Sequence, residues 1–291
     1  MAKKNYSFQK LEEIYQDYLI PNTTIYDVDK KYGIDFGYYM EKFDWTKKTS
    51  LELSDRRRKT KFGSEILKDF SKMDDKLAYI LGLIYADGWI STKPSKCFGI
   101  RLVQTDSYLV KNTLDYIISN RILKTDKNSK GYVVSSERIY DNLVKLGVKE
   151  HKTEAALYLP SLSDDLMWHF LRGFFDGDGS VYFDKQALRV NFCSTQQPFL
   201  EEIRVFLEKE GIYSNINCEK RVGKSIKVCG RDSVCKFDMY RLFIRKNEEL
   251  IKFYNKLYNN SEVFKLTRKE DKFIKWIKNR NGIFTNKRLN Q

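Results

Sequence analysis

The sequence predicts an α+β protein built from two similar subdomains, with a separate helical domain before them. The main observation is an internal repeat, since residues 77–88 (LAYILGLIYADG) resemble residues 168–179 (WHFLRGFFDGDG). After each copy, strands, a helix, further strands and a last helix are predicted in the same order. The repeat unit is far too long for a solenoid, so we predict two subdomains rather than an array.

The elements of each copy follow from hydrophobic periodicity. After the Asp-Gly pair, a short extended piece precedes a strand in which apolar and polar residues alternate. A helix, further extended segments and a closing helix follow. In the first copy these segments are 89–91, 98–103, 108–118, 132–134 and 138–146. In the second copy they are 180–183, 188–193, 199–209, 240–244 and 248–257.

The residues before the repeat predict a helical domain with the order of a helix-turn-helix. Leu11, Ile14 and Tyr18 follow helical spacing. Thr24 is a candidate N-cap of a second helix, and Gly33 offers the turn before a third. An ordinary helical bundle without a role in DNA binding fits the same pattern. The basic run that follows favours the first interpretation, because a cationic segment beside a DNA-reading helix can follow phosphates.

We therefore divide the chain into five parts. They are a helical, helix-turn-helix-like domain that is a candidate for DNA binding (1–45), a basic linker (46–70), the first repeat (71–160), the second repeat (161–268) and a basic C-terminal tail (269–291).

The charge of the chain points to a polyanionic partner. The 291 residues include 53 Lys and Arg against 39 Asp and Glu, a formal net charge of +14. Such an excess attracts nucleic acid more often than any other polyanion. No membrane association is expected, because the longest apolar run, 77–86, is half the length of a bilayer span. The basic N-terminus is followed by no apolar stretch, so a signal peptide is not expected and the predicted location is the cytoplasm.

Small residues at four-residue spacing predict that the two repeat helices pack closely. Ala78, Gly82 and Ala86 form such a stripe in the first copy, and Gly173 and Gly177 match it in the second. Small side chains let two helix backbones approach each other. The simplest arrangement packs the two helices together about a pseudo-two-fold axis.

That arrangement brings Asp87 and Asp178 together at two helix C-termini. Each C-terminus already carries partial negative charge, and two adjacent carboxylates repel each other. A divalent cation relieves both effects, and carboxylate and carbonyl oxygens suit Mg²⁺ or Mn²⁺. The predicted ligands are Asp87, Asp178, Ala86 and Gly177. Zinc is not expected, because the five cysteines are scattered without a CxxC pair. The alternative is that Asp-Gly simply ends each helix, which would be favoured if one copy stood alone.

A metal site on a basic protein suggests phosphodiester hydrolysis. The paired motifs also resemble those of the LAGLIDADG homing endonucleases. Residues 80–88 and 171–179 align with the motif, and the resemblance covers about residues 77–268. It implies an αββαββα unit per repeat, two sheets forming a saddle over DNA, and metal binding by Asp87 and Asp178. Two copies in one chain resemble the monomeric members, which cut long non-palindromic sites. Tyr85 stands where the motif often has an earlier acid, a position that is not the principal ligand.

The resemblance also implies a lysine after the last helix of each repeat, near the metal-bound water. Lys152 is the candidate in the first copy and Lys265 in the second. Such lysines could polarise water or balance phosphate charge. The alternative for each is a solvated surface lysine. Gln104 matches a polar position near the water network, with Ser194 as its counterpart.

Strand alternation predicts a face of each sheet that reads DNA. In residues 98–103, Phe98, Ile100 and Leu102 point one way and Arg101 the other; residues 188–193 repeat the pattern. The predicted base-reading residues are Arg101, Arg189 and Asn191. The predicted phosphate contacts are Lys220, Arg221, Lys224, Lys227 and Arg231 in a hairpin, with Arg56, Arg57 and Arg58 in the linker.

The sequence thus predicts a monomeric homing endonuclease that cuts both strands of DNA with Mg²⁺ or Mn²⁺. The alternatives are an RNA-splicing maturase, for which intron RNA is the partner, and a DNA-binding regulator that does not cleave. Retention of both acids favours cleavage, because a pure binding protein has no need for them. A protein that combines endonuclease and maturase activity also fits the sequence.

Overall fold

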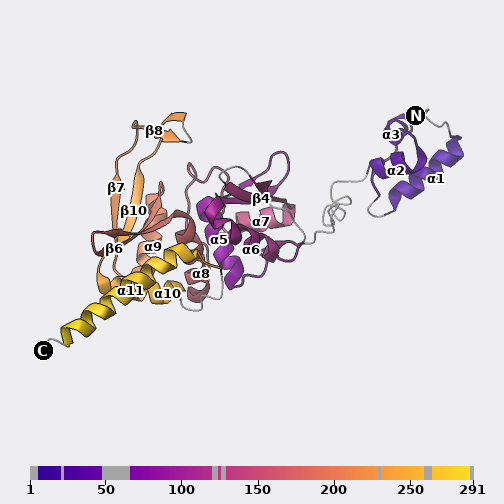
Figure 1. Cartoon of the computed structure of the whole chain (residues 1–291). Helices are drawn as coiled ribbons and strands as arrows, with labels where there is room; N and C mark the ends of the chain where they lie inside the picture. The colour runs from indigo at the N-terminus through magenta and orange to yellow at the C-terminus, as the bar shows by residue number, and fades with distance from the viewer. Residues whose placement is uncertain are drawn as a thin grey trace. The chain divides into compact units, whose positions relative to one another are not determined.

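The computed structural model describes residues 6–20, 23–47, 66–119, 124–125, 129–228, 231–258 and 264–288. The chain divides into two compact units (Figure 1). Unit 1 comprises Met1–Leu67 with Ile118–Arg121, and unit 2 comprises Lys68–Ile117 with Ile122–Gln291. Apart from Ile118–Arg121, both repeats lie in unit 2. Three residues of the predicted linker, Arg56, Arg57 and Arg58, lie outside the described part of the chain.

The described residues of unit 1 form three helices, α1 (Phe8–Leu19), α2 (Ile25–Tyr32) and α3 (Phe36–Lys42). A capping box begins α2: the Thr24 hydroxyl accepts from the Asp27 N–H, and the Asp27 carboxylate accepts from the Thr24 N–H at 2.8 Å. Gly33 ends α2 at a φ of 68°, which glycine adopts without steric cost. The predicted order of helix, turn and helix is confirmed, while contact with DNA stays a prediction.

The first repeat of unit 2 has the predicted αββαββα order. Its elements are α5 (Asp75–Asp87), β1 (Gly88–Ser91), β2 (Cys97–Val103), a 3-10 turn η1 (Gln104–Asp106), α6 (Ser107–Ile117), β3 (Lys124–Thr125), β4 (Ser129–Ser135) and α7 (Glu137–Lys145). The strands form an antiparallel sheet in the order β1-β2-β4-β3.

The second repeat has the same plan with one addition. Its elements are α8 (Asp164–Asp178), β5 (Gly179–Asp184), β6 (Ala187–Ser194), α9 (Gln197–Lys209), β7 (Asn215–Glu219), β8 (Ser225–Val228), β9 (Arg231–Val234), β10 (Met239–Ile244) and α10 (Asn247–Tyr258). The sheet order β5-β6-β10-β7 is that of the first repeat. The hairpin β8-β9 is inserted between its last two strands and forms a separate two-stranded sheet.

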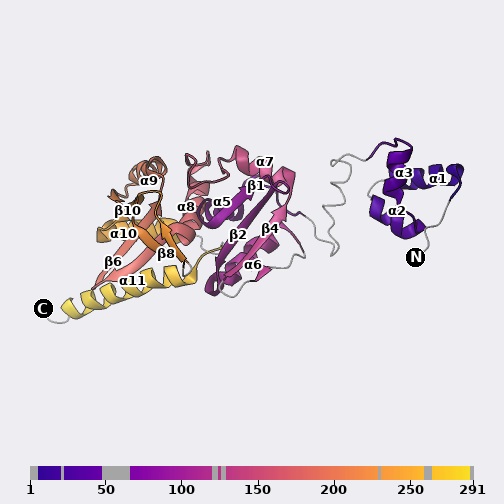
Figure 2. The same ribbon diagram turned by 90° about the horizontal axis from the view of Figure 1, so that it is seen from above.

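Each sheet has one face covered by helices, as the strand alternation predicts. In β2, Phe98 and Ile100 are buried whereas Arg101 is exposed. In β6, Leu188 and Val190 are buried in the same way. Helix α6 packs on β2 and β4, and α9 packs on β6 and β10 (Figure 2). The opposite faces of both sheets are left without a helical cover from these elements.

The predicted C-terminal tail is mostly a helix that belongs to the second repeat. Helix α11 (Thr267–Arg288) buries Phe273 and Trp276, and the Phe273 ring lies 6.4 Å from that of Phe175. Lys272 donates to the carbonyl of Val181 in β5 at 2.9 Å. Apolar contacts hold this basic segment in place, which its charge alone does not suggest.

The boundary between the predicted linker and the first repeat also shifts. Phe70, which was predicted to end the linker, is buried and its ring lies 6.2 Å from Phe98. Asn142 in α7 donates to the carbonyl of Asp69 at 2.9 Å. The chain therefore enters the core of the first repeat before α5 begins.

Helices α5 and α8 meet backbone to backbone, as the stripe of small residues predicts. A Cβ placed on Gly82 would lie 2.0 Å from the carbonyl oxygen of Phe170. A Cβ placed on Gly173 would lie 1.9 Å from that of Tyr79. Such distances are impossible for real atoms, so any side chain at these two positions must force the helices apart. Both helix ends are positioned by this seam.

We predict that Gly82→Leu and Gly173→Leu each destabilise the protein. Overpacking of a close contact typically costs about 1–3 kcal/mol, and backbone atoms have less room to yield than side chains. Chemical denaturation of each variant measures the change. Gly37→Ala in α3 is the control, because an added Cβ there meets no atom closer than 3.6 Å. Equal stability of wild type and the Leu variants would contradict a close backbone contact between α5 and α8 at these glycines.

Candidate active site

Asp87 and Asp178 are the last residues of α5 and α8. Gly88 and Gly179 follow them, and each donates its N–H to the preceding helical turn, at Ile84 and Phe175 respectively. The seam brings the two helix ends together: a Cβ on Gly177 would lie 2.8 Å from the Asp87 Oδ2. The sequence therefore places both carboxylates at one point through the small residues that precede them.

The surroundings of the two acids oppose their ionisation. Burial raises the pKa of Asp178 to about 6, and the charge of Asp87 adds to this rise. Burial also raises the pKa of Asp87. In both cases the positive charges of Lys152 and Lys269 act in the opposite direction. The protein thus holds two carboxylates where their negative charge is costly without a cation.

Lys152 caps the C-terminal end of α5. Its Nζ donates to the carbonyl of Ile84 at 3.0 Å and of Tyr85 at 2.9 Å, and it also contacts the carbonyl oxygen of Ala86. Burial lowers the pKa of Lys152 to about 8, although the charges of the two acids oppose this decrease. The structure therefore brings the predicted lysine to the end of the helix that carries Asp87.

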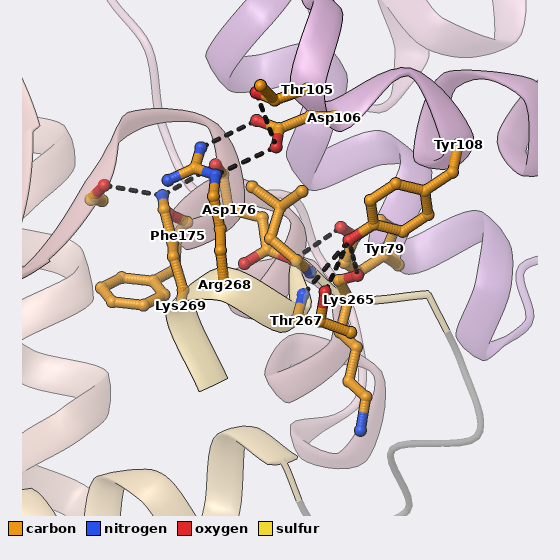
Figure 3. A network of polar contacts seen from close by, with 12 residues as sticks. Tyr79, Thr105, Asp106, Tyr108, Phe175, Asp176, Lys265, Thr267, Arg268 and Lys269 are labelled. Carbon is orange, nitrogen blue, oxygen red and sulfur yellow. Dashed lines mark hydrogen bonds and ion pairs between the residues drawn. The ribbon is translucent and has the colours of Figure 1, made fainter. Parts of the chain in front are cut away.

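Lys269, not Lys265, has the equivalent place in the second repeat. Its Nζ donates to the carbonyls of Phe175 at 2.5 Å, Asp176 at 2.7 Å and Gly179 at 2.7 Å (Figure 3). Burial lowers its pKa to about 8. The ammonium group of Lys265 instead lies 2.7 Å from Glu270. Lys265 was the predicted residue because it lies after the last predicted helix of the second repeat, as Lys152 does in the first. The chain runs further in the second repeat before it reaches the site, in the first turn of α11.

The residue two positions before each acid, Tyr85 or Asp176, forms a hydrogen bond with the segment that leads to the lysine. In the first repeat, the Tyr85 hydroxyl donates to the carbonyl of Leu146 at 2.8 Å. In the second, the Asp176 carboxylate accepts from the Leu266 N–H at 2.8 Å and from the Tyr79 hydroxyl at 2.6 Å. Asp176 is buried, and burial raises its pKa to about 6. Two different side chains thus perform the same structural task.

The predicted polar positions Gln104 and Ser194 lie where β2 and β6 end. Gln104 is exposed in η1, and Ser194 accepts from the N–H of Gln196 at 3.0 Å. Each residue begins the turn that leads from its strand into the following helix. Their predicted role near the water network stays a prediction.

One predicted base-reading residue cannot contact DNA directly as it stands. Asn191 is 1% exposed, and its Oδ1 accepts from Arg241 at 3.4 Å. Arg241 in β10 was not predicted, although its alternation with the buried Leu242 was visible in the sequence. Arg241 lies on the uncovered face, and Asn191 orients it. Arg189 is partly exposed and pairs with Asp184 at 3.3 Å.

The predicted hairpin is present as β8-β9 and the turn before it. Lys224 and Lys227 are exposed, whereas Lys220 pairs with Asp238 at 2.8 Å and Arg221 with Glu219 at 2.9 Å. Arg231 begins β9 opposite Val228. Among the described side chains, four cations therefore lie in the turn before the hairpin and on β8.

The acids fit a hard divalent cation. Among the described residues, no third His, Cys, Asp or Glu joins them in a cluster of metal-binding geometry. Mg²⁺ commonly uses one or two carboxylates and completes its shell with water and phosphate oxygens, so two acids are sufficient. The Ala86 carbonyl already accepts from Lys152, but a carbonyl oxygen has a second lone pair for a metal. Gly177 lies against Asp87.

Two further expectations concern membranes and thiols. Within the described residues, no helix combines the length and apolar character that a membrane crossing requires. The described cysteines Cys97, Cys193, Cys218 and Cys235 have free thiols.

Comparison with known proteins gives a family match to the second repeat and longer matches to individual proteins. A model of the LAGLIDADG-like domain family matches residues 165–258. Uncharacterized protein MJ0398 of Methanocaldococcus jannaschii is 30% identical over 210 residues, which cover 69% of this chain and 71% of that protein. Uncharacterized protein MJ1054 of the same organism is 23% identical over 162 residues, covering 50% of this chain but 18% of MJ1054. Mesophilic variants of the homing endonuclease I-DmoI have 17% identity and a TM-score of 0.41, over 65% of this chain and 92% of theirs.

We predict that the metal-free protein becomes less stable as the pH rises from 4 to 6. Because the pKa of Asp178 is raised to about 6, the folded state binds its proton more tightly than the unfolded state does. The slope from one such group is at most about 1.4 kcal/mol per pH unit. Asp176 contributes in the same direction.

Denaturation in EDTA at several pH values measures this dependence. Asp178→Asn should reduce the slope. Asp238→Asn is the control, because the pKa of Asp238 is lowered to about 2 by Lys220 and by backbone N–H groups. Its contribution is lost only as the pH falls below 4, so the slope between 4 and 6 should stay. An unchanged slope in Asp178→Asn would contradict the prediction.

Proposed function

The chain belongs to the LAGLIDADG family, and on that premise we propose that it is a site-specific endonuclease that hydrolyses both strands of DNA with Mg²⁺ or Mn²⁺. One observation carries the proposal: each repeat combines an acid at the end of its motif helix with a lysine, partly buried in the first repeat and buried in the second, at the same helix end. The pairs are Asp87 with Lys152 and Asp178 with Lys269. A protein that merely binds DNA gains nothing from two raised carboxylate pKa values at one point.

In this proposal the two acids bind the metal, and the two lysines keep the acids in position. Asp87 and Asp178 would hold the metal, which when bound stabilises charge on the attacking and leaving oxygens of a phosphodiester. Lys152 and Lys269 hold the last carbonyls of α5 and α8 and so keep both acids in place. With a pKa of about 8, each Nζ can also exchange a proton with nearby water at neutral pH.

DNA would bind on the faces of the sheets that α6 and α9 leave uncovered. Arg101 in the first sheet, with Arg189 and Arg241 in the second, supplies cations and hydrogen-bond donors there. Lys224 and Lys227 extend this basic surface along the hairpin. Because one chain supplies two related half-sites, a monomer suffices for a long site without a palindrome. The net charge of +14 supports the attraction of a polyanion.

Selection of cleavable sites tests the proposal. The protein is incubated with a random or genomic DNA library and Mg²⁺, and the cut ends are sequenced. A recurring site with cuts in both strands supports an endonuclease. Absence of cleavage, with binding retained, would overturn the proposal in favour of a regulator or an RNA-binding maturase.

We predict that Asp87→Asn and Asp178→Asn each abolish cleavage of the selected site and leave binding largely intact. Asparagine keeps the shape of the side chain but removes the charge that a divalent cation needs. The expected loss in the rate of double-strand cleavage is on the order of 100-fold or more. EDTA should also stop cutting. Asp115→Asn in α6 is the control, since Asp115 pairs with Lys111 on an exposed helix surface. Cleavage near the wild-type rate by either variant would mean that the site lies elsewhere.

We also predict that residues 1–65 add affinity rather than chemistry. A truncated protein that starts at Ile66 keeps Phe70, both acids and both lysines. Its footprint on the selected site should be shorter, with the cut position unchanged. Loss of contacts from Arg56, Arg57 and Arg58 should reduce the slope of log affinity against log salt by about 0.9 per contact. An unchanged footprint and salt slope would leave this segment without a role in binding DNA.

A further inference from the structure

Asp106 in the first repeat holds an arginine that belongs to the second. Asp106 ends η1 and is 3% exposed. Its carboxylate accepts from the Nε of Arg268 at 3.0 Å and from the Nη2 at 2.8 Å (Figure 3). Arg268 stands in the first turn of α11, directly before Lys269. A bidentate pair of this kind fixes both the position and the plane of the guanidinium.

The other half of the molecule has a contact at the corresponding place. The turn that follows β6 leads into α9, as η1 leads into α6. From this turn, Gln196 donates to the carbonyl of Thr153 at 3.0 Å and Thr195 donates to the same oxygen at 3.4 Å. Thr153 directly follows Lys152. In both halves, therefore, the turn after the second strand of one repeat contacts the segment that carries the lysine of the other.

The two contacts differ in charge. On the Lys269 side, the contact is an ion pair whose arginine side chain is 51% exposed. On the Lys152 side, neutral side chains hold a backbone oxygen, and His151 occupies the position before the lysine. One half of the site therefore has a strongly fixed guanidinium that the other half does not match at this position.

The ion pair is not the sole contact between the first repeat and the segment that begins α11. The Tyr108 hydroxyl donates to the carbonyl of Lys265 at 3.1 Å and accepts from the N–H of Thr267 at 3.1 Å. Within the second repeat, Asp176 in α8 also accepts from the N–H of Leu266. These bonds directly precede Arg268 and anchor the stretch of chain that leads to it. A role in attachment alone does not account for a half-exposed arginine on a buried acid.

Arg268 is half exposed, so a ligand can reach it, and its charge acts on Asp87. A guanidinium has five N–H donors, of which Asp106 uses two. The charge of Arg268 lowers the pKa of Asp87 and that of Asp106 raises it, so both lie within electrostatic range of the site. Arginine recognises phosphate well, because its planar donors match two oxygens.

We propose that Arg268, positioned by Asp106, contacts the phosphodiester that is cut in one of the two strands, so that the two strands are cut by unequal half-sites. This inference rests on the proposed endonuclease activity. It assigns Arg268 to substrate contact and Asp106 to positioning. It also distinguishes the strand served by the Lys269 side from the strand served by the Lys152 side.

The test is strand-resolved cleavage of the selected duplex, with each strand labelled separately and the protein in excess over DNA. Arg268→Gln should slow one strand by on the order of 100-fold, leave the other within about threefold, and accumulate nicked duplex. Asp106→Asn should slow the same strand by a smaller factor. The double variant should be no slower than Arg268→Gln alone, because Asp106 acts through the arginine.

Two controls separate substrate contact from a structural role. Arg204→Gln removes an arginine that pairs with Glu201 and Glu208 on α9, and both strands should be cut at the wild-type rate. Tyr108→Phe weakens the attachment of α11, so it should lower the melting temperature without a preference for one strand. A binding measurement in Ca²⁺ adds a readout without turnover. Replacing the phosphate at the slowed cut by a neutral methylphosphonate should weaken wild type more than Arg268→Gln.

The outcomes are distinct. If wild type cuts both strands and Arg268→Gln slows neither strand, or both equally, the inference is overturned while the proposed function stands. Equal effects of the methylphosphonate on wild type and Arg268→Gln would also overturn it. If wild type cuts no DNA at all, both the proposed function and this inference fail.

Discussion

The architecture of unit 2 depends on the contact between α5 and α8, where two helix backbones touch at Gly82 and Gly173. Because neither glycine has a Cβ, the two helices can approach until their C-terminal ends meet, and no room for a Cβ remains at either position. Each helix ends in an acid, so the same contact that joins the repeats also places Asp87 beside Asp178. Stability and site geometry are thus set by one feature. A loss of either glycine would separate the repeats and the carboxylates together.

This contact creates an electrostatic problem that the rest of the site addresses. Two carboxylates and two helix C-termini concentrate negative charge in a partly buried place. Lys152 and Lys269 each donate to the last carbonyls of one helix, which adds hydrogen bonds where the regular helical pattern ends. Their positive charge also lowers the cost of ionising the acids. The partial negative charges of the two helix C-termini remain, and a divalent cation can offset them.

Equivalent positions of the two repeats make equivalent contacts, although the residues at these positions differ. Tyr85 and Asp176 occupy the same motif position and both hold the segment that carries a lysine, through a hydroxyl in one copy and a carboxylate in the other. The turns after β2 and β6 both reach across to the opposite repeat, with Asp106 on one side and Gln196 on the other. Conserving the contact while changing its charge makes two chemically different halves from one fold.

The sequence by itself determined the features that depend on local pattern. Hydrophobic periodicity predicts the order of helices and strands, and the alternation along β2 and β6 predicts their buried faces. The spacing of small residues in the paired motifs predicts that Asp87 meets Asp178. Only the tertiary structure decided the features that depend on contacts between residues distant in sequence. Lys269 replaces Lys265 because the segment after α10 reaches the site later than the segment after α7. Asn191 is buried, and it accepts from Arg241, which is distant in sequence but lies on the neighbouring strand β10. Arg268 meets Asp106 across the two repeats. Local spacing predicts which side a residue faces, but long-range packing decides which residue it meets.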